Sequence, residues 1–169
     1  MGFGVIEVSK QKINLLEIDV LILEKIKKSN LKLKKIYEKI SFLIDTYQPN
    51  ELAIEAPFFG KNVQSMLKLG RAQGVAMLAG INKNIPIFEY APKKIKLAVT
   101  GKGQASKEQV ASMLIYMLNI KKKPKYLDST DGLAVAVCHA LQKKINPSNQ
   151  KSQTKNWTEF VKKNPNRLI

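Results

Sequence analysis

Acidic residues and cysteines are scarce in this sequence of 169 residues. Lysine and arginine number 29 against 13 aspartates and glutamates, which gives a formal net charge of +16. That surplus predicts a polyanionic partner, with nucleic acid favoured over a membrane. One cysteine, Cys138, excludes an intramolecular disulfide framework and a zinc site built from several cysteines. We interpret Cys138 as a small core residue and expect a reducing, cytoplasmic setting.

Long hydrophobic runs are also lacking. No segment reaches the ~18 consecutive apolar residues of a membrane-spanning helix, and no apolar leader of the secretory type is present, so no membrane partner is expected. The apolar share of 44% is ordinary for a globular domain. After Lys144 the composition shifts to Asn, Ser, Gln and Lys. We therefore expect one domain over residues 1–144, followed by a basic linker and a short tail over 145–169.

Strand-like and helix-like segments alternate, which predicts an α/β domain with a mixed sheet. Ser29 and Asn62 are the expected N-caps of two long helices, and the spacing of Ser106 and Gln109 predicts a capping box. The expected strands are 3–8, 13–23, 52–55 and 85–90, and the expected helices are 31–47, 63–81, 93–99, 107–118 and one that begins near Asp128.

Glu55 follows a short apolar run and precedes Pro57, which cannot donate to a strand ladder. The carboxylate is therefore expected at the carboxyl end of a buried strand, where open α/β sheets place their chemistry. An ion pair with a lysine is the equally weighted alternative, because a lone buried carboxylate is costly.

Asp128 and Asp131 are three residues apart, so they share one face at the start of a helix. One interpretation makes Asp128 the N-cap and Asp131 an acid favoured by the helix dipole. The other makes both acids part of one site, which explains why the rest of the helix is almost wholly apolar. His139 lies about two turns beyond Asp131, so we expect a partly buried helix residue rather than a ligand.

Several short motifs occur in a characteristic order over residues 1 to about 143. They are Ala53-Ile54-Glu55, Phe58, Lys61-Asn62, the segment 69–76, the segment 86–92, Lys96, Val99-Thr100-Gly101, Gly103, Ala105, Lys107, Gln109-Val110 and the segment 128–139. In these motifs the chain resembles the RuvC family of Holliday-junction resolvases (crossover junction endodeoxyribonucleases), within the ribonuclease H-like superfamily.

This resemblance implies a ribonuclease H-like fold, in which helices flank a mixed central sheet. It implies a homodimeric, Mg²⁺-dependent endonuclease that nicks two strands of a four-way DNA junction and works with a RuvA–RuvB branch-migration complex. Glu55, Asp128 and Asp131 would be catalytic and would hold the metal, with two Mg²⁺ ions expected per site. Phe58, Lys61, Lys96 and Lys107 match positions where the family contacts DNA. We expect Phe58 to be exposed for stacking and Phe59 to be buried.

The family pattern begins with a strand that carries an aspartate followed by Pro-Gly, upstream of the segment that resembles residues 2–6. This sequence starts at Met1, inside the pattern, and Asp19 lies in the wrong strand to replace that acid. We expect either a start codon assigned too late or a truncated form. The alternative function is then a junction-binding module that cannot cut.

Gly70 and Gly74 lie one turn apart within a predicted helix, where each glycine costs roughly 1 kcal/mol relative to alanine. Close packing on the sheet or a close contact between two copies of the chain would offset that cost. The sequence leaves both explanations open.

Overall fold

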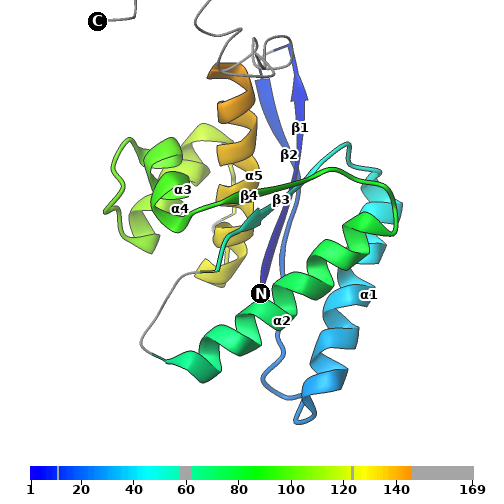
Figure 1. Cartoon of the computed structure of the whole chain (residues 1–169). Coiled ribbons are helices and arrows are strands. Elements are labelled where there is room, and N and C mark those ends of the chain that lie inside the picture. The colour runs from blue at the N-terminus through cyan, green and yellow to red at the C-terminus, as the bar shows by residue number, and fades with distance from the viewer. Residues whose placement is uncertain (11, 58–61, 123, 146–169) are drawn as a thin grey trace, which may run out of the picture.

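The computed structural model describes residues 1–10, 12–57, 62–122 and 124–145, which form two strand pairs enclosed by helices (Figure 1). The expected α/β architecture is confirmed in these residues. In chain order the elements are β1 Gly2–Ser9, β2 Lys12–Val20, α1 Ser29–Tyr47, β3 Leu52–Glu55, α2 Val63–Ile81, β4 Ile87–Tyr90, α3 Pro92–Thr100, α4 Lys107–Met117 and α5 Leu127–Ile145.

Two of the three expected helix starts are confirmed in atomic detail. The Asn62 side chain accepts a hydrogen bond of 3.0 Å from the Ser65 amide at the start of α2. At α4, Ser106 and Gln109 form the reciprocal capping box. The prediction for Ser29 was wrong, because Lys28 occupies the N-cap of α1 and no side chain caps it. α1 therefore begins one residue earlier than a serine cap requires.

The sheet contains antiparallel and parallel pairing, but its two halves are separate. β1 and β2 form an antiparallel hairpin with an irregularity between Val5 and Ile6, and β3 pairs in parallel with β4. Within the described residues no strand ladder joins the two pairs. The mixed sheet is thus interrupted between β1 and β3.

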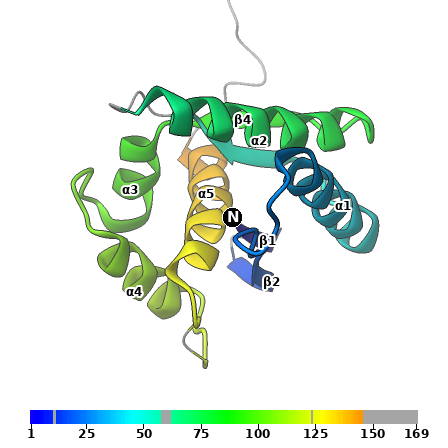
Figure 2. The ribbon, with the colours of Figure 1, turned by 90° about the horizontal axis from the view of Figure 1, so that it is seen from below.

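Both halves of the sheet lie between the same helical layers. Ile6 of β1 and Ala53 of β3 pack against a core that includes Leu133 and Val137 of α5. On the opposite face, Val5 and Ile54 pack against a second core built mainly from α1 and α2. Figure 2 shows this order, with α5 on one side of the β1–β2 hairpin and α1 on the other. α3 and α4 lie beyond α5.

No helix in the described part of the chain is both long enough and apolar enough to cross a membrane. Cys138 is fully buried in α5, as the sequence predicted. The positions 58–61 and the proposed tail lie outside the described residues, apart from Ile145, which ends α5.

Candidate functional site

A cavity of about 1440 Å³ lies between the two halves of the sheet. Its walls include the consecutive residues 1–8, which contain β1, and 49–57, which contain β3. Five of the seven predicted site residues line it, and they come from β3, α3, α4 and α5. They are Glu55, Lys96, Lys107, Asp128 and Asp131.

Glu55 is the last residue of β3, as its position before Pro57 predicted. The final rung of the β3–β4 pairing is the bond of 2.9 Å from the Ala56 amide to the Tyr90 carbonyl. β3 itself ends at Glu55, and Pro57 follows with no N–H for any further strand pairing. The Glu55 side chain is thereby held at the mouth of the cavity and remains exposed.

The first turn of α5 directs its two aspartates outward. The Ser129 and Thr130 hydroxyls donate to the carbonyls of Tyr126 and Leu127 and are buried within the turn. The side chains of Asp128 and Asp131 are 64% and 36% exposed. α5 begins at Leu127, so Asp128 lies in the first turn and the N-cap interpretation of this residue is wrong.

Lys107 connects the two aspartates to the start of α4. Its Nζ atom donates to Asp131 Oδ2 at 2.8 Å and lies 3.7 Å from Asp128 Oδ1. The hydrogen bond to Asp131 is the main cause of the raised pKa of Lys107, with further contributions from the charges of Asp131 and Asp128. A fixed positive charge therefore stands beside both carboxylates.

The Glu55 carboxyl has a raised pKa. Desolvation by the surrounding protein is the largest cause, and the negative charge of Asp131 adds to it. The positive charges of Lys107 and Lys96 act in the opposite direction. Lys96 lies in α3, where it is half-buried and lines the same cavity as Glu55.

The three acids do not form a closed metal site. Across the described residues, no group of three or more His, Cys, Asp or Glu side chains is placed to hold one metal ion. Phe58 and Lys61, and the expected burial of Phe59, lie outside the described residues and stay predictions.

A side-chain network that the sequence did not reveal includes three residues that line the same cavity, Glu51, His139 and Lys143. His139 bonds through Nδ1 to the Tyr90 hydroxyl at 2.7 Å and through Nε2 to Glu51 at 2.8 Å, and Lys143 also pairs with Glu51. His139 is 9% exposed and lies within α5, which agrees with the expectation of a partly buried helix residue. The three partners come from β4, α5 and the residue before β3, so sequence spacing carried no signal for them.

The exposed face of α2 argues against one of the two explanations for its glycines. A Cβ atom added to Gly70 or Gly74 would meet no atom of the described chain within 4 Å, so packing on the sheet is wrong for both. The glycines lie in the middle of an apolar row, which we call the α2 stripe. Its other members are exposed, and they are Val63, Leu67, Leu78 and Ile81.

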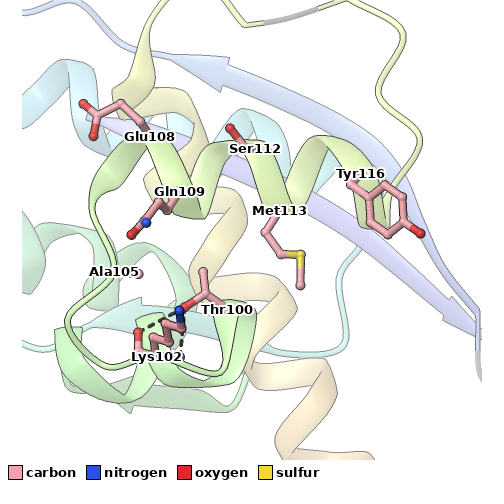
Figure 3. Close-up of a pocket in the computed structure, with 8 residues that line it drawn as sticks. All are labelled: Thr100, Lys102, Ala105, Glu108, Gln109, Ser112, Met113 and Tyr116. Atoms are coloured by element: carbon pink, nitrogen blue, oxygen red, sulfur yellow. Dashed lines mark hydrogen bonds between the residues drawn. The ribbon is translucent and has the colours of Figure 1, made fainter.

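A second, smaller cavity of about 480 Å³ lies between the end of α3 and α4 (Figure 3). The Thr100 hydroxyl bonds to the backbone of Lys102 at its rim. Glu108 carries the only carboxylate among the eight residues that line this cavity. Figure 3 shows Glu108 and Tyr116 at opposite ends of these residues. None of the predicted site residues lines this cavity, so the chemistry is assigned to the larger one.

Comparison with known proteins matches this arrangement. Residues 1–139 match the family described as "Crossover junction endodeoxyribonuclease RuvC". Proteins of that name from Christiangramia forsetii and Cytophaga hutchinsonii are 58% and 54% identical over 168 residues, which cover 99% of this chain and 86% and 82% of the respective relatives.

Two solved structures of Thermus thermophilus RuvC share 27% sequence identity with the chain and cover 85% of it. One gives a TM-score of 0.75 over 88% of its own length. The other is described as RuvC "in complex with Holliday junction substrate" and gives a TM-score of 0.77 over 87% of its length. The ribonuclease H-like fold is thereby confirmed, and the chain belongs to the RuvC family of crossover junction endodeoxyribonucleases.

Proposed function

We propose that this protein resolves four-way DNA junctions by nicking two strands symmetrically during recombination and repair, in a Mg²⁺-dependent reaction in the cytoplasm. The observation that carries the proposal is the convergence of Glu55, Asp128 and Asp131 on one cavity, beside two lysines. The junction complex of a solved relative supports the choice of substrate. In this proposal the nuclease domain spans residues 1–144 together with Ile145 at the end of α5, and a basic linker and tail follow.

The chemistry of the three acids suits Mg²⁺. Their donors are carboxylate oxygens, which this ion prefers. Lys107 already places a positive charge beside Asp128 and Asp131. Desolvation and the negative charge of Asp131 raise the pKa of the Glu55 carboxyl, and a bound cation would relieve both effects. Glu55, Asp128 and Asp131 would hold two Mg²⁺ ions. The bound ions would supply an activated water and neutralise charge on the phosphate.

The lysines of the site would bind the DNA. Lys96 and Lys107 line the cavity beside the acids, so their ammonium groups would contact the phosphate next to the cut bond. Phe58 and Lys61 would extend this surface, with Phe58 stacked on an unpaired base. Contacts to phosphate position DNA without reading its sequence. Junction selectivity would therefore come from shape and from stacking.

In this proposal, full cleavage activity requires a fourth acidic residue in addition to Glu55, Asp128 and Asp131. The three acids of the described chain do not close around a metal ion, and the aspartate with which the family pattern begins has no counterpart among them. A strand placed in the cavity between β1 and β3 would end beside Glu55 and could carry that aspartate. The gap between the two strand pairs of the described residues supports the second candidate function, which is junction binding without cleavage.

A homodimer would place two equal sites on one junction. The α2 stripe supports this part of the proposal. Its glycines leave open space in the middle of the row, and its exposed aliphatic side chains lie on either side of them. Another helix could therefore approach closely at Gly70 and Gly74. The RuvA–RuvB complex is the expected partner for branch migration.

A gel-shift series with the full chain tests the proposal. A labelled four-way junction should bind more tightly than a duplex of equal length. Affinity should fall steeply with salt, with a log–log slope of about −0.9 for each phosphate neutralised. Equal affinity for junction and duplex would contradict the resolvase and leave a general binder of nucleic acid.

A further inference from the structure

We propose that His139 is a positioning residue, which together with Tyr90 and Glu51 fixes α5 against the β3–β4 pair and so holds Asp131 near Glu55. The inference rests on the function proposed above, because both acids belong to its metal site. The hydrogen bonds of His139, the side chains of β3 and the lengths of the strand and the helix support it.

The imidazole of His139 forms a hydrogen bond at each of its two nitrogens. Nε2 donates to Glu51 at 2.8 Å, because a carboxylate can only accept. Desolvation acts to raise the pKa of the Glu51 carboxyl, but the hydrogen bonds from Lys143 and His139 outweigh it and lower the pKa overall. Nδ1 accepts from the Tyr90 hydroxyl at 2.7 Å, and desolvation raises the pKa of Tyr90, so the hydroxyl keeps the proton that it donates. The two bonds together fix the position and the orientation of the ring.

Aromatic rings of β4 pack against the same imidazole. The ring centroids of Phe88 and Tyr90 lie 4.5 and 5.7 Å from that of His139. Tyr90 and His139 are both buried, so water has little access to the bond between them. Loss of the Tyr90 hydroxyl would therefore leave a ring nitrogen without a ready substitute partner.

β3 offers α5 little else that could fix their relative position. Alternate side chains of a strand face opposite sides. Ala53 packs against the core that contains α5, and Ile54 packs against the core built from α1 and α2, so Glu55 shares the face of Ala53. The small side chain of Ala53 is thus the one apolar contact that β3 itself makes on that side. Apolar contact is non-directional, so the directional bonds of His139 set how far α5 lies along β3.

The strand and the helix have matching lengths on either side of this contact. Glu51 and Glu55 are four residues apart in an extended segment, which spans about 13 Å. Asp131 and His139 are eight residues apart in α5, which spans about 12 Å. Since His139 bonds to Glu51 at one end, Asp131 reaches Glu55 at the other, where its charge helps to raise the pKa of the Glu55 carboxyl. Tyr90 joins the two ends, because it is the pairing partner of Glu55 in β4.

A double-mutant cycle on metal binding by the full chain tests this role without any cleavage. The probe is Mn²⁺, which takes the same oxygen ligands as Mg²⁺. The measured quantity is the Mn²⁺ concentration that halves the amide NMR signal of Gly132, which follows Asp131. Tyr90→Phe, which removes a single hydroxyl, should raise that concentration about fivefold, as expected for the loss of one hydrogen bond. Glu55→Gln should raise it in the wild type but add little in the Tyr90→Phe chain, because Glu55 is then no longer held in place.

Two further variants separate positioning from general stability. Val137→Ala truncates a fully buried side chain of the same helix and spares the bonds of His139, so it should lower the melting temperature and keep the full effect of Glu55→Gln. Glu51→Ala should act like Tyr90→Phe, whereas Glu51→Gln keeps an acceptor oxygen for His139 and should restore most of the effect of Glu55→Gln. Junction affinity in a gel shift should stay unchanged in each single variant other than Glu55→Gln, which shows that the chains are folded.

A full effect of Glu55→Gln in the Tyr90→Phe chain would overturn the proposal and leave His139 a structural residue. So would an equal loss of that effect in Val137→Ala, because stability alone would then explain it. Absence of any effect of Glu55→Gln in the wild type would instead remove Glu55 from the metal site. That result would contradict the proposed function and the positioning role together, so the two failures are told apart by the wild-type measurement.

Discussion

Lys107 donates a hydrogen bond of 2.8 Å to Asp131 and so connects the first turn of α4 to the first turn of α5. The same ammonium lies 3.7 Å from Asp128. The lysine thus holds the two aspartates in the orientation in which both face the cavity. In the proposed function, the same ammonium would also contact a phosphate that approaches the two acids.

Lys107→Ala should affect DNA binding more than stability. The paired side chains are exposed, and exposed ion pairs contribute about 0.2–1 kcal/mol, so the free energy of unfolding should change by less than about 1 kcal/mol. The magnitude of the log–log salt slope of junction binding should fall by about 1, which corresponds to the loss of one phosphate contact. Lys83→Ala is the matched control, because Lys83 pairs with Asp45 rather than with an acid of the site. An equal loss of junction affinity in both variants would remove Lys107 from the interface.

Glu55→Gln, Asp128→Asn and Asp131→Asn should each abolish junction cleavage in a cleavage-competent form of the protein. Junction binding should persist or improve, because each change removes a negative charge near phosphate. The measurement is nicking of an end-labelled junction in Mg²⁺, beside a gel shift. Asp45→Asn, at an acid that does not line the cavity, should cut at the wild-type rate. Full cleavage by any of the three variants would exclude that acid from the site.

Glu55 should make stability depend on pH in a defined direction. Its folded-state pKa is raised above the ordinary 4.5, mainly by desolvation, so folding disfavours its charged form. The wild type and Glu55→Gln should melt alike below pH 4.5, where both side chains are neutral. As the pH rises through the raised pKa, the wild type should lose stability relative to the variant. A melting series from pH 4 to 8 checks this, and a variant that is less stable at pH 7 would contradict the assignment.

Leu78→Glu should disrupt the proposed homodimer. A charge within the α2 stripe, one turn beyond Gly74, would have to be desolvated in a helix-to-helix contact, which costs several kcal/mol when it is unpaired. Sedimentation should show a monomer that retains the melting temperature of the wild type. Ser65→Glu adds the same charge at an exposed position outside the stripe and should remain dimeric. A dimer that survives Leu78→Glu would place the interface elsewhere.

The sequence predicted the elements of this fold better than their assembly. Pro57 correctly ended the β3 strand, and Asn62 and Ser106 correctly capped their helices, because these effects are local. The prediction of Ser29 as an N-cap failed because Lys28 takes that position. The sequence alone could not show which of the two residues begins the helix.

Among the site residues, Glu55, Lys96, Lys107, Asp128 and Asp131 were chosen largely through resemblance, and the fold brings them to one cavity. The bonds of Lys107 to the aspartates and of His139 to Tyr90 and Glu51 depend on tertiary packing. Residue spacing therefore could not reveal them. The exposure of Gly70 and Gly74 is likewise a property of the folded surface, which is why the sequence left their role open.

The central claim is a site of three acids that a strand between β1 and β3 completes. The most direct measurement compares Mg²⁺-dependent nicking of a four-way junction, together with the melting temperature, for the 169-residue chain and two extended versions. Each extension adds one apolar strand before Met1, which ends in aspartate in one version and in asparagine in the other. Both extensions should raise the melting temperature, and cleavage should appear with the aspartate version alone. Equal cleavage by the asparagine version or by the unextended chain would contradict the account.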